Sequence, residues 1–374
     1  MRKDLDGTEK RIIWLDVART LAILSVTFNH ALSRSFDTHI GTLAEYQSVP
    51  HLVSAIKALL YVFSRGGVPW FLMITAVLLL SRDYTGEEKT KLFMKRNWLP
   101  LFITSEIWLA IIFFYLVIFG TKTGLSGIGQ ILFAFIQNQL FINQTTFASM
   151  WYLSMILILY LMIPVFAVAL QRIDGRYIKL LLGVGIMIGM IIPNINAILS
   201  GFGIGYQLEP SVSITDLFSL YCIYLFAGYF IGKGELSRLN ELTVAAIALI
   251  SYLLTSIFQY WIYSTSSDYY VRYSDFGVLL FSVFTFEIIR RKGDGIKVGK
   301  NWFTRISKIS FAIYFVHVSI MYALNTGMRY LPIAINHLTK FLILECVAVP
   351  LSIVIISVLS HVRVFKKYLF MIKD

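Results

Sequence analysis

The chain has few charged side chains: Asp, Glu, Lys and Arg together make up 14 % of its 374 residues. Soluble globular proteins carry roughly 25 %, so this composition excludes a cytosolic enzyme, a secreted disulfide scaffold and a coiled coil. Hydrophobic residues make up 57 %, and the mean hydropathy is +0.72. Because a helix that crosses a bilayer needs ~20 mostly apolar residues, the sequence indicates an integral membrane protein.

Cysteine is nearly absent, and both thiols, Cys222 and Cys346, lie inside apolar runs without a Cys or His at metal-ligand spacing. We therefore expect neither a disulfide nor a metal site, and we expect both thiols to be buried as small hydrophobic side chains. Strict alternation of apolar and polar residues is also missing, which argues against an outer-membrane barrel. The net charge of +12 is spread between apolar runs, so a nucleic-acid partner is not expected.

Apolar runs of spanning length predict an all-α, polytopic transmembrane bundle of about ten helices. The predicted spans are 12–32, 58–81, 98–119, 150–170, 178–199, 215–232, 243–263, 271–290, 306–328 and 339–361. A shorter, more polar candidate at 127–147 is assigned to an external loop over 120–149, which could be re-entrant. We treat 1–374 as one membrane domain with cytoplasmic tails at 1–11 and 362–374.

Most of the 33 Lys and Arg residues lie on one side of this predicted topology. They gather at both termini and in four connections: 82–97, 172–179, 233–238 and 290–305. Under the positive-inside rule, both termini are cytoplasmic. The chain is therefore predicted to be a multi-pass protein of a cell membrane, plasma or inner.

The first span carries three ionisable side chains, Asp16, Arg19 and His30. An ionisable group at the bilayer centre costs about 2.5–3.5 kcal/mol, so each marks a candidate site. Arg19 and His30 lie within about 20° of one helix face, and Asp16 is spaced to pair with Arg19. Histidine suits proton transfer near neutral pH. The alternative is an ion pair that only fixes helix packing, with a histidine at the interface.

Weaker candidates lie in other spans. Glu106 is early in the third span, Glu345 is in the last, and His317 lies mid-helix with Tyr314 one turn before it. For each of these, a helix–helix hydrogen bond or a snorkelling side chain is an equally good interpretation.

The opening motif resembles a known family. Leu-Asp-Val-Ala-Arg at 15–19, followed after ten residues by His30, is similar to the first motif of the acyltransferase-3 family of membrane acyltransferases. Further stretches agree in order and spacing: 68–76, 95–100, 150–153, 224–229 and 309–317. The resemblance is to the stand-alone branch, which includes O-acetyltransferases. Thr75-Ala76 departs from the family's Ser-Gly pair, and Ser149 stands where this branch often has His.

The resemblance implies an enzyme that moves an acyl group, most commonly acetyl, from cytoplasmic acyl-CoA to a hydroxyl outside the membrane. The acceptor would be a cell-surface or lipid-linked glycan, and membrane lipids surround the protein. We expect His30 to act as base or acyl carrier, Arg19 to hold the thioester or oxyanion, and Asp16 to position Arg19.

The remaining expected site residues fall into two groups. The basic ones, expected to bind the CoA phosphates, are Lys95, Arg96 and Arg305. Those expected to line the substrate cavity are Trp151, Tyr152, Tyr314, His317 and Glu106. No metal is expected. The alternatives are a transporter or flippase, although no repeated halves are visible, and a non-catalytic family member linked to polysaccharide export.

Overall fold

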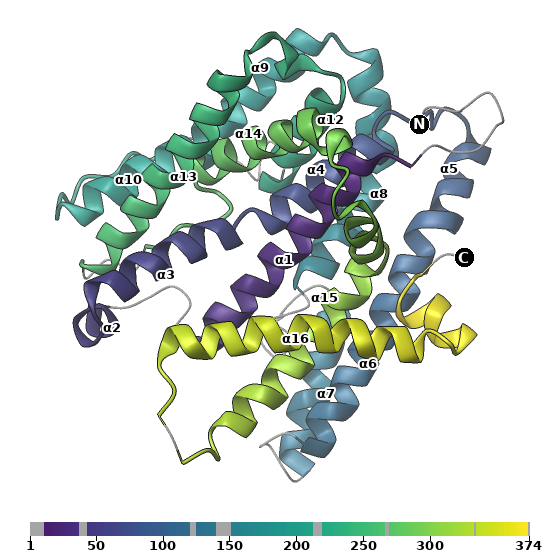
Figure 1. Ribbon diagram of the computed structural model, residues 1–374. Helices are drawn as coiled ribbons and strands as arrows, with labels where there is room; N and C mark the ends of the chain where they lie inside the picture. Colours follow the sequence, from purple (N-terminus) through teal and green to yellow (C-terminus); the bar gives the residue numbers. More distant parts are fainter. Residues whose placement is uncertain are drawn as a thin grey trace. The chain divides into compact units, whose positions relative to one another are not determined.

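The computed structural model describes residues 11–36, 43–119, 125–139, 151–211, 219–265, 269–332 and 334–372 (Figure 1). Within these ranges every regular element is a helix and there is no strand. The chain divides into two compact units, which we describe separately. The first contains Met1–Ser81 and Ile173–Ser352, and the second contains Arg82–Arg172 and Ile353–Asp374. Residues 1–10 of the predicted N-terminal tail lie outside the described residues, and so do 120–124 and 140–149 of the predicted external loop, which flank a helix at Leu125–Gln139. The predicted C-terminal tail is described as far as residue 372.

The helices of the first unit come from both ends of the chain. They are α1 (Ile13–Ser35), α2 (Leu43–Ser48), α3 (His51–Ser64), α4 (Gly67–Leu79), α9 (Gly175–Ile186), η3 (Met187–Ile191), α10 (Ile192–Gly201), α12 (Leu220–Gly232), η4 (Glu235–Arg238), α13 (Glu241–Tyr263), α14 (Phe276–Lys292), η5 (Gly293–Gly295), α15 (Lys300–Met328) and most of α16 (His337–Leu359). The second unit holds α5 (Glu87–Phe93), η1 (Met94–Trp98), α6 (Leu99–Phe119), α7 (Leu125–Gln139), α8 (Trp151–Arg172) and η6 (Phe365–Leu369).

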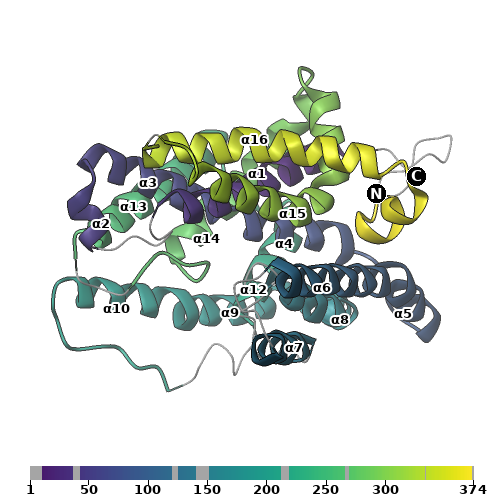
Figure 2. The ribbon, with the colours of Figure 1, turned by 90° about the horizontal axis from the view of Figure 1, so that it is seen from below.

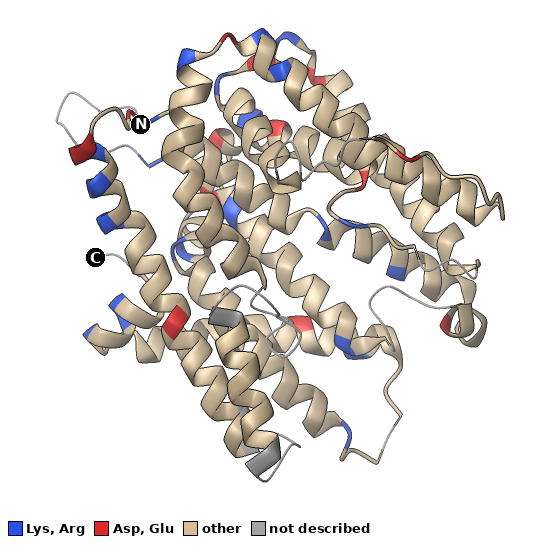
Figure 3. Ribbon diagram, turned by 180° about the vertical axis from the view of Figure 1, so that it is seen from behind, with Lys and Arg blue, Asp and Glu red and all other residues tan. Residues whose placement is uncertain are grey.

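The helical membrane fold predicted from composition is confirmed. Each predicted span contains a helix in its described part, and in the described residues seven helices are long and apolar enough to cross a membrane. Figure 3 shows long stretches of ribbon without a charged residue. The other three predicted spans correspond to α1, α12 and α14, and the last two have only 13 and 17 residues.

The two cysteines differ in exposure. Both are free thiols, and Cys222 on α12 is buried as expected. Cys346 is exposed, so that expectation was wrong. It lies on α16, whose apolar surface is the kind that lipid covers.

Helix α1 is the centre of the first unit and lies beside α15 (Figures 1 and 2). Its alanines Ala18, Ala22 and Ala31 have no exposed surface, and small side chains allow other helices to approach closely. A Cβ atom added to Gly67, at the start of α4, would lie 2.8 Å from the carbonyl oxygen of Ala22. Close helix packing around α1 therefore requires a glycine at this position.

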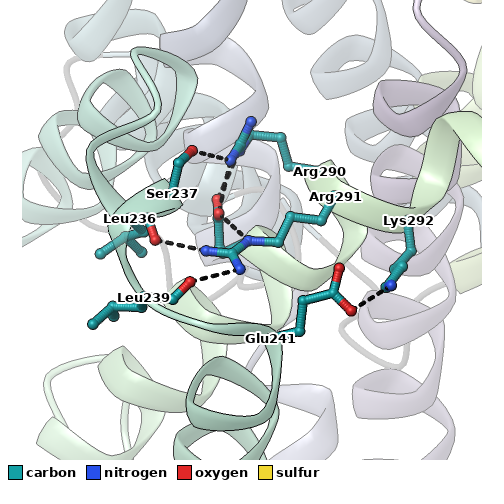
Figure 4. Close-up of polar contacts among 8 residues, drawn as sticks. Leu236, Ser237, Leu239, Glu241, Arg290, Arg291 and Lys292 are labelled. Carbon is teal, nitrogen blue, oxygen red and sulfur yellow. Dashed lines mark hydrogen bonds and ion pairs between the residues drawn. The ribbon is translucent and has the colours of Figure 1, made fainter.

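The end of α14 is anchored by the buried carboxylate of Glu287. It accepts hydrogen bonds from Arg290 Nε at 2.7 Å and from Arg291 Nε at 2.6 Å. Arg291 also donates to the carbonyl oxygens of Leu236 and Leu239, at 2.6 and 2.9 Å (Figure 4). Two guanidinium groups and one carboxylate thereby tie α14 to the segment around η4.

We predict that Glu287→Gln destabilises the protein by about 3 kcal/mol, because two partly buried guanidinium groups lose their shared counter-charge. Thermal unfolding in detergent micelles measures the change. The matched control is Glu241→Gln, whose carboxylate pairs with Lys292 at the exposed surface and should matter little. Equal midpoints for the two variants would contradict the anchoring role of Glu287.

Candidate active site

Asp16 lies in the first turn of α1 and is buried, with 4 % of its surface exposed. Its two oxygens accept hydrogen bonds from Arg11, from Nε at 2.6 Å and from Nη2 at 2.9 Å. Helix α15 supplies two more donors, the hydroxyls of Ser307 at 2.7 Å and Thr304 at 3.3 Å. The charge of the carboxylate is thus neutralised by Arg11, and its oxygens also accept hydrogen bonds from two hydroxyls of α15.

This network corrects one expectation. We expected Asp16 to pair with Arg19, but its counter-ion is Arg11. Arg11 precedes the helix, and its side chain can fold back over the first turn to present two parallel N–H groups to the carboxylate. Arg19 is half-buried one turn further along α1.

Helices α1 and α15 run parallel. Near the start of both helices, Asp16 contacts Ser307, and Thr20 Oγ1 donates to the carbonyl oxygen of Phe303 at 3.2 Å. Further along both, the rings of His30 and His317 lie 5.2 Å apart between centroids. Since a helix rises 1.5 Å per residue, the two contacts are separated by roughly 20 Å along α1. The polar face predicted on α1 is therefore packed against α15, and we call this contact between the two helices the seam.

The imidazole of His317 is completely buried. Its Nδ1 lies 2.7 Å from the carbonyl oxygen of Ile313, which can only accept, so Nδ1 carries the proton. In the neutral ring, Nε2 then holds a lone pair. No described residue hydrogen-bonds to this buried nitrogen. His317 is thus fixed in one tautomer with its basic atom available, beside a half-buried His30.

A buried acid joins the same part of the first unit. Thr27, one turn before His30, donates to Glu345 Oε1 at 2.6 Å. The other oxygen, Oε2, is buried without a hydrogen-bond partner in the described ranges. The sequence marked Glu345 only as an acid in an apolar run, because nothing in its spacing connects α16 to α1.

The other expected residues of α15 lie at different positions along the seam. Tyr314 is buried, and its ring centroid is 6.4 Å from that of His317. Arg305 is exposed, one residue after Thr304 and hence at the Asp16 end. The structure thus brings together Asp16 and α15 at one end and the two histidines and Tyr314 at the other.

The remaining expected residues belong to the second unit. The rings of Trp151 and Tyr152, at the start of α8, are 6.2 Å apart and nearly perpendicular. Glu106 is half-buried on α6. All three belong to the second unit, and their expected role at the substrate stays a prediction.

Lys95 and Arg96 are exposed on η1, a π-helical turn between α5 and α6. Lys95 lines an open hollow of about 730 Å³ together with Lys91, Tyr84 and Trp98, whereas Arg96 is not among its lining residues. Short π-helical turns often mark functional sites. Lys91 and the two aromatic residues were missed from the sequence because only the fold gathers them around one hollow.

The basic 290–305 connection is less available for a ligand than its composition suggested. Arg290 and Arg291 are bound to Glu287, and Lys292 is bound to Glu241 at 2.5 Å. These three cations are each bound by a carboxylate at the end of α14, so Arg305 stays our candidate ligand of the CoA phosphates in this connection.

A comparison with protein-family models identifies the family. The model described as "Acyltransferase domain", that of the acyltransferase-3 family, matches residues 12–359. The chain belongs to this family. No curated protein and no solved structure matched the chain in our searches.

Family membership makes the chain a membrane acyltransferase with an acyl donor and an acceptor substrate. The match runs through both units and includes every expected site residue. It favours an enzyme over a transporter, and it leaves the identity of donor and acceptor open.

We predict that Asp16→Asn acts mainly on stability. The substitution keeps the shape of the side chain but removes the charge that Arg11 and the α15 hydroxyls bind, which should cost about 1–2 kcal/mol. Thermal unfolding of the full chain measures this, and Ser307→Ala should show a smaller loss because it removes one neutral donor. An Asp16→Asn protein that unfolds like the wild type yet transfers no acyl group would contradict this role.

Proposed function

We propose that this acyltransferase takes its acyl group from acyl-CoA on the cytoplasmic side and delivers it to a hydroxyl of a cell-surface or lipid-linked glycan. The observation that carries the proposal is the pairing of His30 with His317, whose Nε2 lone pair is buried and available. Acyl transfer to an alcohol needs a base at the hydroxyl, and a neutral imidazole is well suited to that task.

The proposed reaction has one proton to move. The acceptor oxygen attacks the thioester carbonyl carbon, the new C–O bond forms and the C–S bond breaks. His30 takes the hydroxyl proton and returns it to the departing thiolate, so that free thiol leaves. His317, held by its hydrogen bond to Ile313, lies beside His30 and accepts or shares that proton through Nε2.

Arg19 and Asp16 have supporting roles in this proposal. Arg19 stabilises the oxyanion that develops on the thioester carbonyl. Asp16 fixes α1 against α15 through Ser307 and so positions both Arg19 and His30. Lys95 and Arg305 are our candidates for the CoA phosphates, and the hollow beside Lys95 favours the first of them.

A second route has His30 attack the thioester and carry the acyl group covalently before transfer. The two routes differ in one observable. Without acceptor, the covalent route labels the protein stoichiometrically from radiolabelled acyl-CoA, and His30→Ala prevents the labelling. The general-base route leaves the protein unlabelled.

We predict that His30→Ala lowers acyl transfer by about 10²–10⁴-fold, the usual contribution of a positioned acid–base group. The assay measures transfer of labelled acyl groups from acyl-CoA to the cell-surface polymer in membrane vesicles. Arg19→Ala should also abolish transfer. The control is His361→Ala, which changes an exposed histidine in the turn after α16. A normal rate of acyl transfer by His30→Ala would contradict the assignment of His30 as the catalytic base or acyl carrier.

We predict that His317→Asn lowers transfer by about 10²-fold while the protein still folds. The asparagine amide occupies the place of Nδ1 and can donate to the carbonyl oxygen of Ile313, but it has no atom at the position of Nε2. The rate and the unfolding midpoint are measured on the same preparation. If His317 only supports the fold, this variant keeps its activity.

A further inference from the structure

Arg65 is a buried cation that the proposed mechanism does not use. It lies between α3 and α4 and is the middle residue of the 29-residue apolar run His51–Leu79, with 6 % of its surface exposed. Its guanidinium carbon is 4.5 Å from the ring centroid of Tyr61 and 5.1 Å from that of Tyr273. Aromatic faces attract this charge, and the Tyr61 side chain also has a hydrogen-bond interaction with Arg65.

Two nitrogens of Arg65, Nε and Nη2, are buried and have no hydrogen-bond partner in the part of the chain that the structure describes. Together they form one edge of the guanidinium, with two N–H groups that point the same way. This edge is the one that binds both oxygens of a carboxylate or a phosphate. A buried charged edge without an acceptor is costly, and an anionic ligand removes that cost.

The same chain shows what this edge binds elsewhere. Arg11 uses Nε and Nη2 on the two oxygens of Asp16, and Arg290 uses the same pair on Glu287. Arg65 presents the same two nitrogens, but no carboxylate among the described residues binds them. Asp275, two residues after Tyr273, is already bound by Tyr269 and by the start of α14.

The break between α3 and α4 holds Arg65 next to α1. Ser25 Oγ donates to the carbonyl oxygens of Phe63 and Ser64, at 3.0 and 3.1 Å, and so satisfies the end of α3. The Ser64 hydroxyl donates to the carbonyl oxygen of Tyr61 at 2.6 Å and also lies 3.4 Å from Asn29 Oδ1. Ser64 and Asn29 are therefore in contact, and the next residues in the chain are Arg65 and His30. Broken helices at the middle of a membrane commonly hold substrates.

We propose that the Nε–Nη2 edge of Arg65 binds the carboxylate of a substrate, so that this enzyme acts on a carboxylate-bearing acyl group or on an acidic sugar. The inference rests on the proposed acyl transfer and names its substrate class. A carboxylate carries one charge, which a single guanidinium neutralises, whereas a phosphate monoester carries more. Lys57, the lysine of α3, is paired with Glu45.

The test compares two donors and two acceptors with the purified full chain in lipid nanodiscs. Succinyl-CoA is compared with acetyl-CoA, and a methyl glucuronide is compared with a methyl glucoside. We expect the carboxylated member of one pair to have the higher kcat/KM. Arg65→Met should lower that preference by at least about 10-fold, since bonds to a charged group are lost. A donor effect identifies a dicarboxylic acyl group, and an acceptor effect identifies an acidic sugar.

Two further variants keep the result interpretable. Arg65→Lys retains the charge but not the two parallel donors, so it should also lose the preference. Arg272→Lys is the matched control, because Arg272 lies over the ring of Tyr270 at 4.4 Å but is exposed. If the Arg65 variants do not fold, protection of the wild type from thermal unfolding by succinate, compared with chloride at equal ionic strength, measures the site directly.

The outcomes separate the two proposals. In the first outcome, the enzyme turns over acetyl-CoA with a neutral acceptor, shows no preference for a carboxylate and is not protected by succinate. This result overturns the role of Arg65 and leaves the proposed acyl transfer intact. In the second outcome, the protein turns over no acyl-CoA, but succinate still protects the wild type and does not protect Arg65→Lys. This result overturns the proposed function and supports the anion site at Arg65.

Discussion

The carboxylate of Asp16 is buried between α1 and α15, and the rest of the candidate site depends on how it is satisfied. Arg11 neutralises its charge, and the hydroxyls of Ser307 and Thr304 bind it to the second helix. Because the two helices are parallel, a fixed contact at one end determines which residues meet at the other. His30 and His317 meet there, roughly 20 Å further along α1.

The buried polar groups of the first unit fall into two classes. Some are satisfied within the chain, such as Asp16 with Arg11 and Glu287 with two arginines. Others retain a buried atom with no hydrogen-bond partner among the described residues, and these include Nε2 of His317, Oε2 of Glu345 and two nitrogens of Arg65. His317, Glu345 and the Arg65 segment all lie against the half of α1 that carries His30. A buried polar group without a partner in the chain is expected where a protein binds or transforms a ligand.

Composition and apolar runs were sufficient to predict the helices, because an apolar helix of spanning length needs no information beyond its own residues. Helical spacing likewise identified the Asp16–Arg19–His30 face. Spacing cannot name partners on other helices, so Arg11 as the counter-ion of Asp16 and Glu345 as the partner of Thr27, 318 residues away, emerged only from the fold. Arg65 was missed because the predicted span 58–81 hid the break between α3 and α4.

The central claim is that His30 and His317 act as one unit, and a double-mutant cycle tests it most directly. Acyl-transfer rates are measured for His30→Gln, His317→Gln and the double variant, under single-turnover conditions. If the two side chains act together, either single substitution already removes their joint contribution to the rate. The double variant should then be no slower than the slower single variant. Losses that multiply in the double variant would show that the two histidines act independently and would contradict the account.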